Sequence, residues 1–381
     1  MRGNDRLVIY LDHAATTPLH PLVEEAMLPF NRDIFGNPSS QHQAGRKARN
    51  ALDQARDQVA AVLGAKSSEV FFTSGGTESN NLAVKGVARA MKKIDRGHVL
   101  TTAIEHPSVL ESCAFLEKEG FEISRVLPDR EGLIQKEAIV AGLRENTVLV
   151  SVMAANNEVG TLQPVALIGA ACRERGIPFH VDAVQALGEL DLSVARLNVD
   201  LLTLSAHKVY GPKGVGALFV RSGTLFQPNN HGGGQEGEKR AGTENVAGIV
   251  GLARALVEIQ GEKSGEIRSL RDFLLEGLLE IPGCRLHGSR EHRLANNVNV
   301  GFEGVGGENL FMALDLAGIA VSTGSACSSG AARASHVLLA MGYPSSRARE
   351  AIRLTLGRST KKEELEEVLA KLKELLPRLR R

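Results

Sequence analysis

A lysine and an aspartate at the ends of two predicted strands form the first pair of residues that could take part in catalysis. Lys208 follows the strand LLTL in the segment SAHKVYGPKG, and Asp182 ends the strand FHVD one strand–loop unit earlier. A lysine amine can form a Schiff base once desolvation or nearby cations lower its pKa. An aspartate beside such a lysine is expected of enzymes that use pyridoxal 5′-phosphate (PLP), because the carboxylate keeps the pyridine nitrogen protonated and the ring an electron sink. Taken separately, Lys208 would be an exposed loop lysine and Asp182 a strand-end cap.

Further polar residues come soon after other predicted strands. They are His106, Asn157, Gln185, Ser205 and His207. In open sheets with parallel strands, ligands bind beyond the carboxyl ends of the strands. A series of polar residues at successive strand ends therefore indicates one site assembled by the sheet.

The segment SGGTES joins a predicted strand to a helix and suits a phosphate. Gly76 and Thr77 stand at the start of that helix, where free N–H groups and the helix dipole attract anions. The pattern is weaker than a P-loop, since no GxxxxGK[ST] is present. An ordinary Ser/Thr cap with Glu78 in the first turn explains the segment equally well.

Two residues in the last quarter of the chain could act on a substrate. Cys327 lies in VSTGSACSSGAA, where small residues predict an accessible loop, and accessible cysteines can react as thiolates. Cys113 and Cys172 fall in helical patterns and are expected to be packing residues. Arg353, on the predicted strand in AIRLTLGRS, could grip a carboxylate with its two-pronged guanidinium. The alternatives are a small buried cysteine and a solvated arginine paired with a glutamate.

The elements that must position these residues alternate between strand and helix. The apolar spacing predicts strands at 70–73, 98–102, 122–126, 148–154, 179–182, 201–205 and 215–220, and helices at 41–63, 107–118 and 165–175. This alternation predicts an α/β fold with a mainly parallel sheet and helices on both faces. Helices at 244–260, 264–279 and 361–380 and short strands near 296–301 follow. We interpret them as a smaller α+β domain that the first residues join, which gives a large domain over 15–255 and a small one over 1–14 and 256–381.

The bulk composition excludes several classes of protein. The chain has 381 residues, and its 45 basic and 44 acidic side chains leave a net charge of +1, which argues against nucleic acid or a membrane surface as a partner. No stretch approaches a membrane span, and the N-terminus is too polar for a signal peptide. Four cysteines without CxxC or zinc spacing predict neither a disulfide scaffold nor a metal site. We expect a soluble, cytoplasmic protein.

Motifs along the whole chain resemble those of a known family. YLDHAATTP, FGNPSSQH, FTSGGTESNN, EHPSVL, NNEVGTLQP, HVDAVQALG, SAHKVYGPKGVG, GGGQEGEKRAGTEN, GSACSSG and IRLTLGRST occur in this order along nearly the whole chain. The chain is thus similar to the cysteine desulfurases of the NifS/IscS type, a branch of the class V aminotransferase superfamily. The resemblance implies the seven-stranded sheet of PLP fold type I.

The resemblance also implies a role for each matching residue. Lys208 would bind PLP covalently, His106 would stack on the ring and assist proton transfer, and Asp182 would pair with the pyridine nitrogen. Gln185 and Asn157 would act near the phenolic oxygen. Phosphate ligands would be Gly76, Thr77, Ser205 and His207, joined by Thr243 of the neighbouring subunit in a homodimer with a shared site. Substrate-carboxylate ligands would be Asn37 and Arg353.

The implied reaction removes sulfur from L-cysteine. The Cys327 thiolate would attack the substrate sulfur and become a persulfide, and the substrate would leave as L-alanine. Sulfur would then pass to an iron–sulfur scaffold or another acceptor protein, and Cys327 could transiently ligate an iron–sulfur cluster. Alternatives are a selenocysteine lyase, another class V enzyme such as an aminotransferase, and a non-catalytic scaffold for iron–sulfur assembly. The segment QEGEK, between Gly234 and Arg240, is more acidic than the family pattern and bears on partner contacts.

Overall fold

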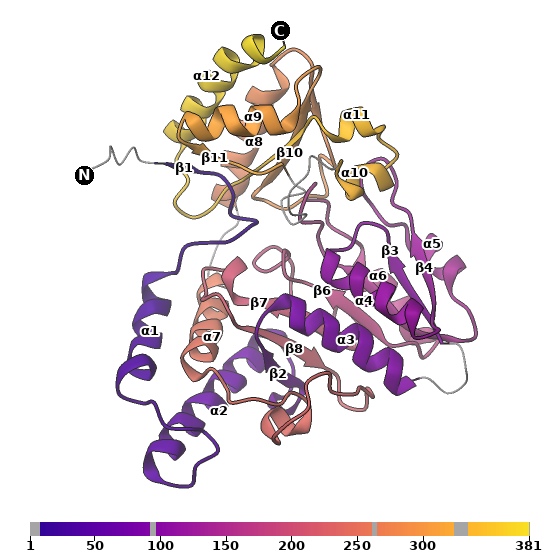
Figure 1. Ribbon diagram of the computed structural model, residues 1–381, viewed down its shortest axis with the longest axis vertical. Coiled ribbons are helices and arrows are strands. Elements are labelled where there is room, and N and C mark those ends of the chain that lie inside the picture. Colours follow the sequence, from indigo (N-terminus) through magenta and orange to yellow (C-terminus); the bar gives the residue numbers. More distant parts are fainter. Residues whose placement is uncertain (1–7, 92–96, 261–264, 324–333, 381) are drawn as a thin grey trace.

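The structure is a computed structural model that describes residues 8–91, 97–260, 265–323 and 334–380. Figure 1 shows a sheet-based body with a second, smaller group of helices and strands above it. None of the helices in the described ranges is both long and apolar enough to cross a membrane.

A seven-stranded mixed sheet forms the centre of the larger body, in the order β2-β8-β7-β6-β5-β3-β4. Its strands are β2 (Val70–Thr73), β3 (His98–Thr102), β4 (Glu122–Val126), β5 (Thr147–Met153), β6 (Phe179–Asp182), β7 (Leu201–Ser205) and β8 (Gly216–Val220). Only the pairings of β8, with β2 and with β7, are antiparallel among these strands. The sheet is therefore mainly parallel, as the alternation of strands and helices predicts.

Helices cover both faces of this sheet. They are α1 (Pro21–Arg32), α2 (Gln43–Leu63), α3 (Gly76–Met91), α4 (Pro107–Lys118), α5 (Lys136–Gly142), α6 (Val165–Glu174) and α7 (Val246–Gln260). Adjacent residues of one strand enter different cores: Leu201 packs with α3 and α4, whereas Leu202 packs with α2, α6 and α7. This burial on both faces explains why the strands are continuous apolar runs.

The smaller group has its own hydrophobic core. That core is formed by α8 (Gly265–Leu279), α9 (Gly307–Leu316), α12 (Lys362–Leu379), β9 (Cys284–Leu286), β10 (Asn297–Phe302) and β12 (Ala351–Thr355). The short helices α10 (His336–Ala340) and α11 (Ser345–Ala348) lie in the same part of the chain, but their buried residues Val337, Leu338 and Ala348 pack in the core of the larger body. β1 (Ile9–Tyr10) pairs in parallel with β11 (Ile319–Ala320). Ile9 and Leu11 thus share a core with the C-terminal segments. The division into domains stays a prediction, and a boundary after Gln260 would keep α7 whole, since Ile259 packs with the larger core.

Candidate active site

A cavity of about 470 Å³ lies at the carboxyl ends of the central strands. Ten of the predicted site residues line it: Gly76, Thr77, His106, Asn157, Asp182, Gln185, Ser205, His207, Lys208 and Arg353. Most of them come from the turns after β2, β3, β5, β6 and β7, where parallel strands deliver side chains to one edge. Arg353 comes instead from β12 of the smaller group. The volume is in the usual range for a small-molecule or cofactor site.

Asp182 is held at the floor of this cavity by donors from two directions. Asn80 donates from Nδ2 to Asp182 Oδ2 at 2.7 Å, and Val184 N–H donates to Oδ1 at 3.0 Å. Asn80 also donates to Ser108 Oγ at 2.8 Å. Because both partners are donors, they orient an ionised carboxylate, which suits Asp182 to pair with a protonated ring nitrogen.

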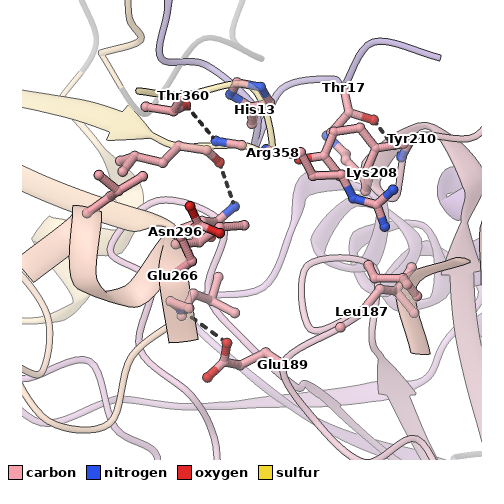
Figure 2. A pocket seen from close by; sticks show the side chains of 18 of the residues that line it. His13, Thr17, Leu187, Glu189, Lys208, Tyr210, Glu266, Asn296, Arg358 and Thr360 are labelled. Atoms are coloured by element: carbon pink, nitrogen blue, oxygen red, sulfur yellow. Dashed lines mark hydrogen bonds between the residues drawn. The ribbon is translucent and has the colours of Figure 1, made fainter. Parts of the chain in front are cut away.

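Lys208 lies between two cavities. Its Nζ donates to the carbonyl oxygens of Ala14 and Ala15, at 2.6 and 2.7 Å. Together with Gln185, it lines both the first cavity and a second one of about 680 Å³, shown in Figure 2. The amine thus stands at the wall between the two cavities and is held there by two backbone carbonyl groups.

His106 is fixed by its position at the start of α4. Its Nδ1 accepts a hydrogen bond from Ser108 N–H at 3.1 Å and so caps the helix. Burial lowers the pKa of His106; Asp182 opposes this shift, whereas the charges of Lys208 and His336 add to it. A neutral ring that accepts through Nδ1 must carry its proton on Nε2.

The predicted phosphate ligands meet at the start of α3. Gly76, Thr77, Ser205 and His207 line both the first cavity and an adjoining one of about 400 Å³. First-turn N–H groups have no acceptor within their own helix and can bind an anion. Burial lowers the pKa of His207 to about 4, and the charges of Lys208 and Lys213 add to this shift. His207 therefore stays neutral near pH 7.

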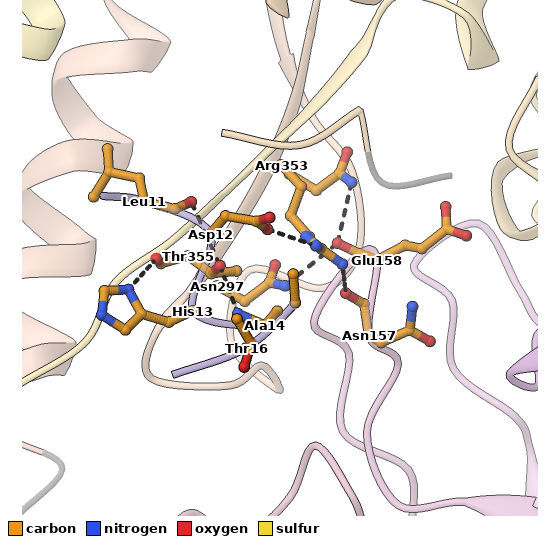
Figure 3. Close-up of polar contacts among 12 residues, drawn as sticks. Leu11, Asp12, His13, Ala14, Thr16, Asn157, Glu158, Asn297, Arg353 and Thr355 are labelled. Carbon is orange, nitrogen blue, oxygen red and sulfur yellow. Dashed lines mark hydrogen bonds and ion pairs between the residues drawn. The ribbon is translucent and has the colours of Figure 1, made fainter. Parts of the chain in front are cut away.

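Arg353 is nearly buried and is held by residues from both parts of the molecule. Its Nη2 donates to Asp12 Oδ1 at 2.8 Å and its Nη1 to the Asn157 carbonyl at 2.7 Å (Figure 3). Its Nε is buried without a hydrogen-bond partner among the described residues. An unpaired donor on a guanidinium that lines the cavity suits a substrate carboxylate.

Three successive carbonyl groups of the loop after β5 are bound by the smaller group. Arg353 donates to the carbonyl oxygen of Asn157. Asn297 and Asn299 both donate to the carbonyl oxygen of Glu158, and Arg293 donates to that of Val159 at 3.0 Å. We call residues 157–159 the clamped loop. Because Asn157 lines the cavity, the smaller group determines the position of part of its wall.

The residues present fit PLP. Buried polar atoms without partners in the described chain include Asn80 Oδ1 and Arg353 Nε, and both residues line the cavity. A Cβ built on Gly76 would lie 2.9 Å from Val184 Cγ2, so this close approach requires glycine. Lysine, an oriented aspartate and a helix N-terminus are the donor set that an aldehyde, a pyridine nitrogen and a phosphate need.

Two of the predicted site residues, Asn37 and Thr243, lie apart from the others, and a third cannot be placed. Asn37 lies exposed in the loop between α1 and α2, where its Oδ1 accepts from Ser39 N–H. Thr243 is exposed just before α7. Neither lines the cavity. Cys327 lies outside the described residues. Cys113 and Cys172 are buried, as expected for packing residues, and burial raises the pKa of each thiol to about 12.

Sequence patterns missed several residues that complete the site. Asp12, Asn80, Ser108, Glu158 and His336 hold the predicted residues and were not singled out. Asn80 and Asp12 each lie inside a family motif, FTSGGTESNN and YLDHAATTP, which was the one available signal.

Comparison with known proteins accounts for this geometry. The model of the family "Aminotransferase class-V" matches residues 9–368. The chain belongs to the class-V aminotransferase family. A cysteine desulfurase IscS of Dictyoglomus turgidum is 50% identical over 376 residues, which cover 98% of this chain and 95% of the relative.

Solved structures of similar proteins share the fold. A "NifS-like protein" superposes with a TM-score of 0.92 at 40% identity and covers 98% of this chain and 100% of its own. The protein SspA, solved in complex with cysteine, has a TM-score of 0.82 at 39% identity, with 91% and 98% coverage. These matches confirm the predicted fold class and the resemblance to cysteine desulfurases.

Proposed function

We propose that this protein is a PLP-dependent cysteine desulfurase that converts L-cysteine into L-alanine and passes the sulfur to Cys327. The observation that carries the proposal is one cavity that contains Lys208, an oriented Asp182 and the nearly buried Arg353, in a chain half identical to a cysteine desulfurase. A keto-acid aminotransferase would need the same lysine and aspartate but would not need Cys327.

Each residue of the cavity has a task in this reaction. Lys208 would hold the cofactor covalently, Asp182 would bind its ring nitrogen, and Gly76, Thr77, Ser205 and His207 would hold its phosphate, with Gln185 and Asn157 near the phenolic oxygen. When bound, PLP supplies an electron sink for an amino acid attached to it. Arg353 would bind the substrate carboxylate through its unpaired Nε–H, and neutral His106 could carry a proton on Nε2.

The sulfur transfer needs a second thiol. In the net reaction the Cβ–S bond of L-cysteine breaks and an S–S bond to Cys327 forms, so that L-alanine leaves and Cys327 becomes a persulfide. No external oxidant is required, because the substrate carbon is reduced as the sulfur is oxidised. The persulfide would then be delivered to an iron–sulfur scaffold or another acceptor protein in the cytoplasm.

Two exposed residues fit a site shared between two copies of the chain. Thr243 would reach the phosphate in the neighbouring subunit, and Asn37 would bind the substrate carboxylate there. Their exposure and their absence from the cavity of their own chain support this arrangement.

The decisive experiment measures the fate of both product and sulfur. We expect purified protein given L-cysteine to release alanine, and mass spectrometry to find 32 mass units, one sulfur atom, added on Cys327. Cys327→Ala should keep the cofactor's absorption band but form no persulfide and release no sulfide. Normal sulfide release by this variant would refute the acceptor assignment, and selenocysteine turnover that survives Cys327→Ser would instead favour a selenocysteine lyase.

A further inference from the structure

A polar cluster next to the cavity joins Glu158 of the clamped loop to the start of α10. The Glu158 side chain is only 4% exposed, and Ser335 donates to it from Oγ at 2.5 Å. His336 Nδ1 lies 3.8 Å from Glu158 Oε1. Burial raises the pKa of Glu158, and His336, Ser335 and Arg353 oppose that shift. A buried carboxyl group is thus provided with a hydroxyl donor and a basic ring, which reduces the cost of its burial.

The other nitrogen of the same ring reaches the segment of His106. His336 Nε2 lies 3.1 Å from the carbonyl oxygen of Glu105. A carbonyl only accepts hydrogen bonds, so Nε2 must carry the proton. When His336 is cationic, Nδ1–H also faces Glu158. Because Glu105 directly precedes His106, this one ring links the buried carboxyl group to the backbone that carries His106.

The orientation and charge of His106 depend on this backbone. Its helix cap requires an unprotonated Nδ1, since that atom accepts from Ser108 N–H. Among the described residues, the titratable groups whose charges act on it are Asp182, Lys208 and His336. A positive charge on His336 disfavours a second positive charge on His106, and thus preserves the cap.

We propose that His336, held by Glu158 and Ser335, is a positioning residue that fixes the Glu105 carbonyl and thereby the ring of His106 in its neutral form. The inference rests on the proposed function, because it assigns His106 a part in that reaction. Loss of the His336 ring removes a donor from the Glu105 carbonyl and leaves Glu158 without its basic neighbour. His106 then loses its backbone support and a neighbouring ring whose positive charge, when present, lowers the pKa of His106.

The test compares kinetics of the holoenzyme across pH. We expect His336→Phe to lower kcat about tenfold, since small displacements of a reacting group are costly, with KM for L-cysteine and the cofactor band within twofold of the parent. In the plot of kcat/KM against pH, the fall on the acid side (the acid limb) should move to higher pH, because His106 then protonates more readily. His336→Gln, which keeps an N–H for Glu105, should restore kcat but not the position of the limb.

Further variants separate positioning from a general effect on the fold. In a His106→Ala background, His336→Phe should cause no further loss. His292→Phe, at an exposed histidine, should match the parent. If His336→Phe lacks the parent's cooperative unfolding, Glu158→Gln, which retains an oxygen for Ser335, must shift the acid limb in the same direction. If the parent is active and the acid limb of kcat/KM stays in place in these variants, this inference alone is overturned. If the parent forms no alanine, the proposed function is overturned.

Discussion

Asp12 and Arg353 form an ion pair of 2.8 Å between the N-terminal segment and β12. The two residues lie far apart in the sequence, yet the pair fixes a guanidinium whose buried Nε has no hydrogen-bond partner among the described residues. The side chain of Arg353 is 5% exposed, so its orientation is set by these contacts and not by solvent.

Arg353→Lys should therefore weaken substrate binding. A lysine keeps the charge but cannot reproduce the fork that engages Asp12, Asn157 and a carboxylate together. We expect KM for L-cysteine to rise about tenfold or more, as the loss of a charge-assisted hydrogen bond implies. Asp12→Ala should raise KM in the same direction. Steady-state kinetics with the exposed Arg349→Lys as control measures the effect, and an unchanged KM in both variants would contradict it.

Lys208→Ala should abolish the covalent link to the cofactor. We expect the purified parent to be yellow and the variant to lose the visible absorption band of the lysine-bound cofactor. Lys213→Ala, which removes a lysine from the phosphate end only, should retain the band. A band of parental position and intensity in Lys208→Ala would show that another amine binds the cofactor.

Asn80→Leu should loosen the cofactor without disturbing the lysine. The substitution preserves the approximate volume but removes the donor to Asp182 Oδ2. Loss of one hydrogen bond to a charged group predicts about a tenfold rise in the dissociation constant of PLP. Titration of apoprotein followed by absorbance measures this constant, and the exposed Asn31→Leu provides the control. Equal constants for parent and Asn80→Leu would remove Asn80 from the site.

Glu105→Gln should change how stability depends on pH. Burial raises the pKa of Glu105 to about 8, and Thr102 and Met153 N–H oppose this shift. Between pH 4.5 and 8 the folded state binds a proton that the unfolded state has lost, so this group makes the parent less stable as pH rises. The variant lacks that dependence. Its Tm relative to the parent should increase by about 2 °C or more from pH 5 to pH 8.

Calorimetry at both pH values tests this prediction. The exposed Glu111→Gln serves as the control, since an exposed carboxyl group contributes no such slope. A Tm difference between Glu105→Gln and the parent that does not change with pH would mean that Glu105 is ionised in the folded protein.

Mixed dimers can test the shared site. If Thr243 acts in the neighbouring subunit, a dimer of Lys208→Ala and Thr243→Ala chains contains one fully intact site. Such a dimer, isolated with two affinity tags, should bind PLP at that site with parental affinity. If Thr243 instead acts in its own chain, both sites of the mixed dimer are defective and PLP affinity falls.

Much of the fold could be predicted because apolar periodicity reports burial. The predicted ranges 98–102, 107–118 and 122–126 coincide with β3, α4 and β4. Helix α1 was missed although Val23, Ala26, Met27 and Phe30 recur at helical spacing; Val23 is the only one of them that the fold buries. Helix α10 was missed because five residues are too few for a periodic pattern.

The site was predictable where residues lie next to strand ends and unpredictable where it depends on distant pairs. Lys208 follows β7 and Asp182 ends β6, so the order of the elements already predicted that the two residues lie close together. Asn80 meets Asp182 across 102 residues, and His336 meets Glu105 across 231. Such contacts arise from packing between elements and leave no local pattern in the sequence.

The clamped loop has a mechanical consequence. Its three carbonyl groups are tied to β10, β12 and Arg293, although the chain leads into it from β5 of the large sheet. Any hinge motion between the two bodies would carry Asn157 along with the C-terminal one and strain the peptide leading from Met153. A ligand gripped by both Arg353 and Lys208 would oppose such motion, so substrate occupancy should stiffen the whole protein.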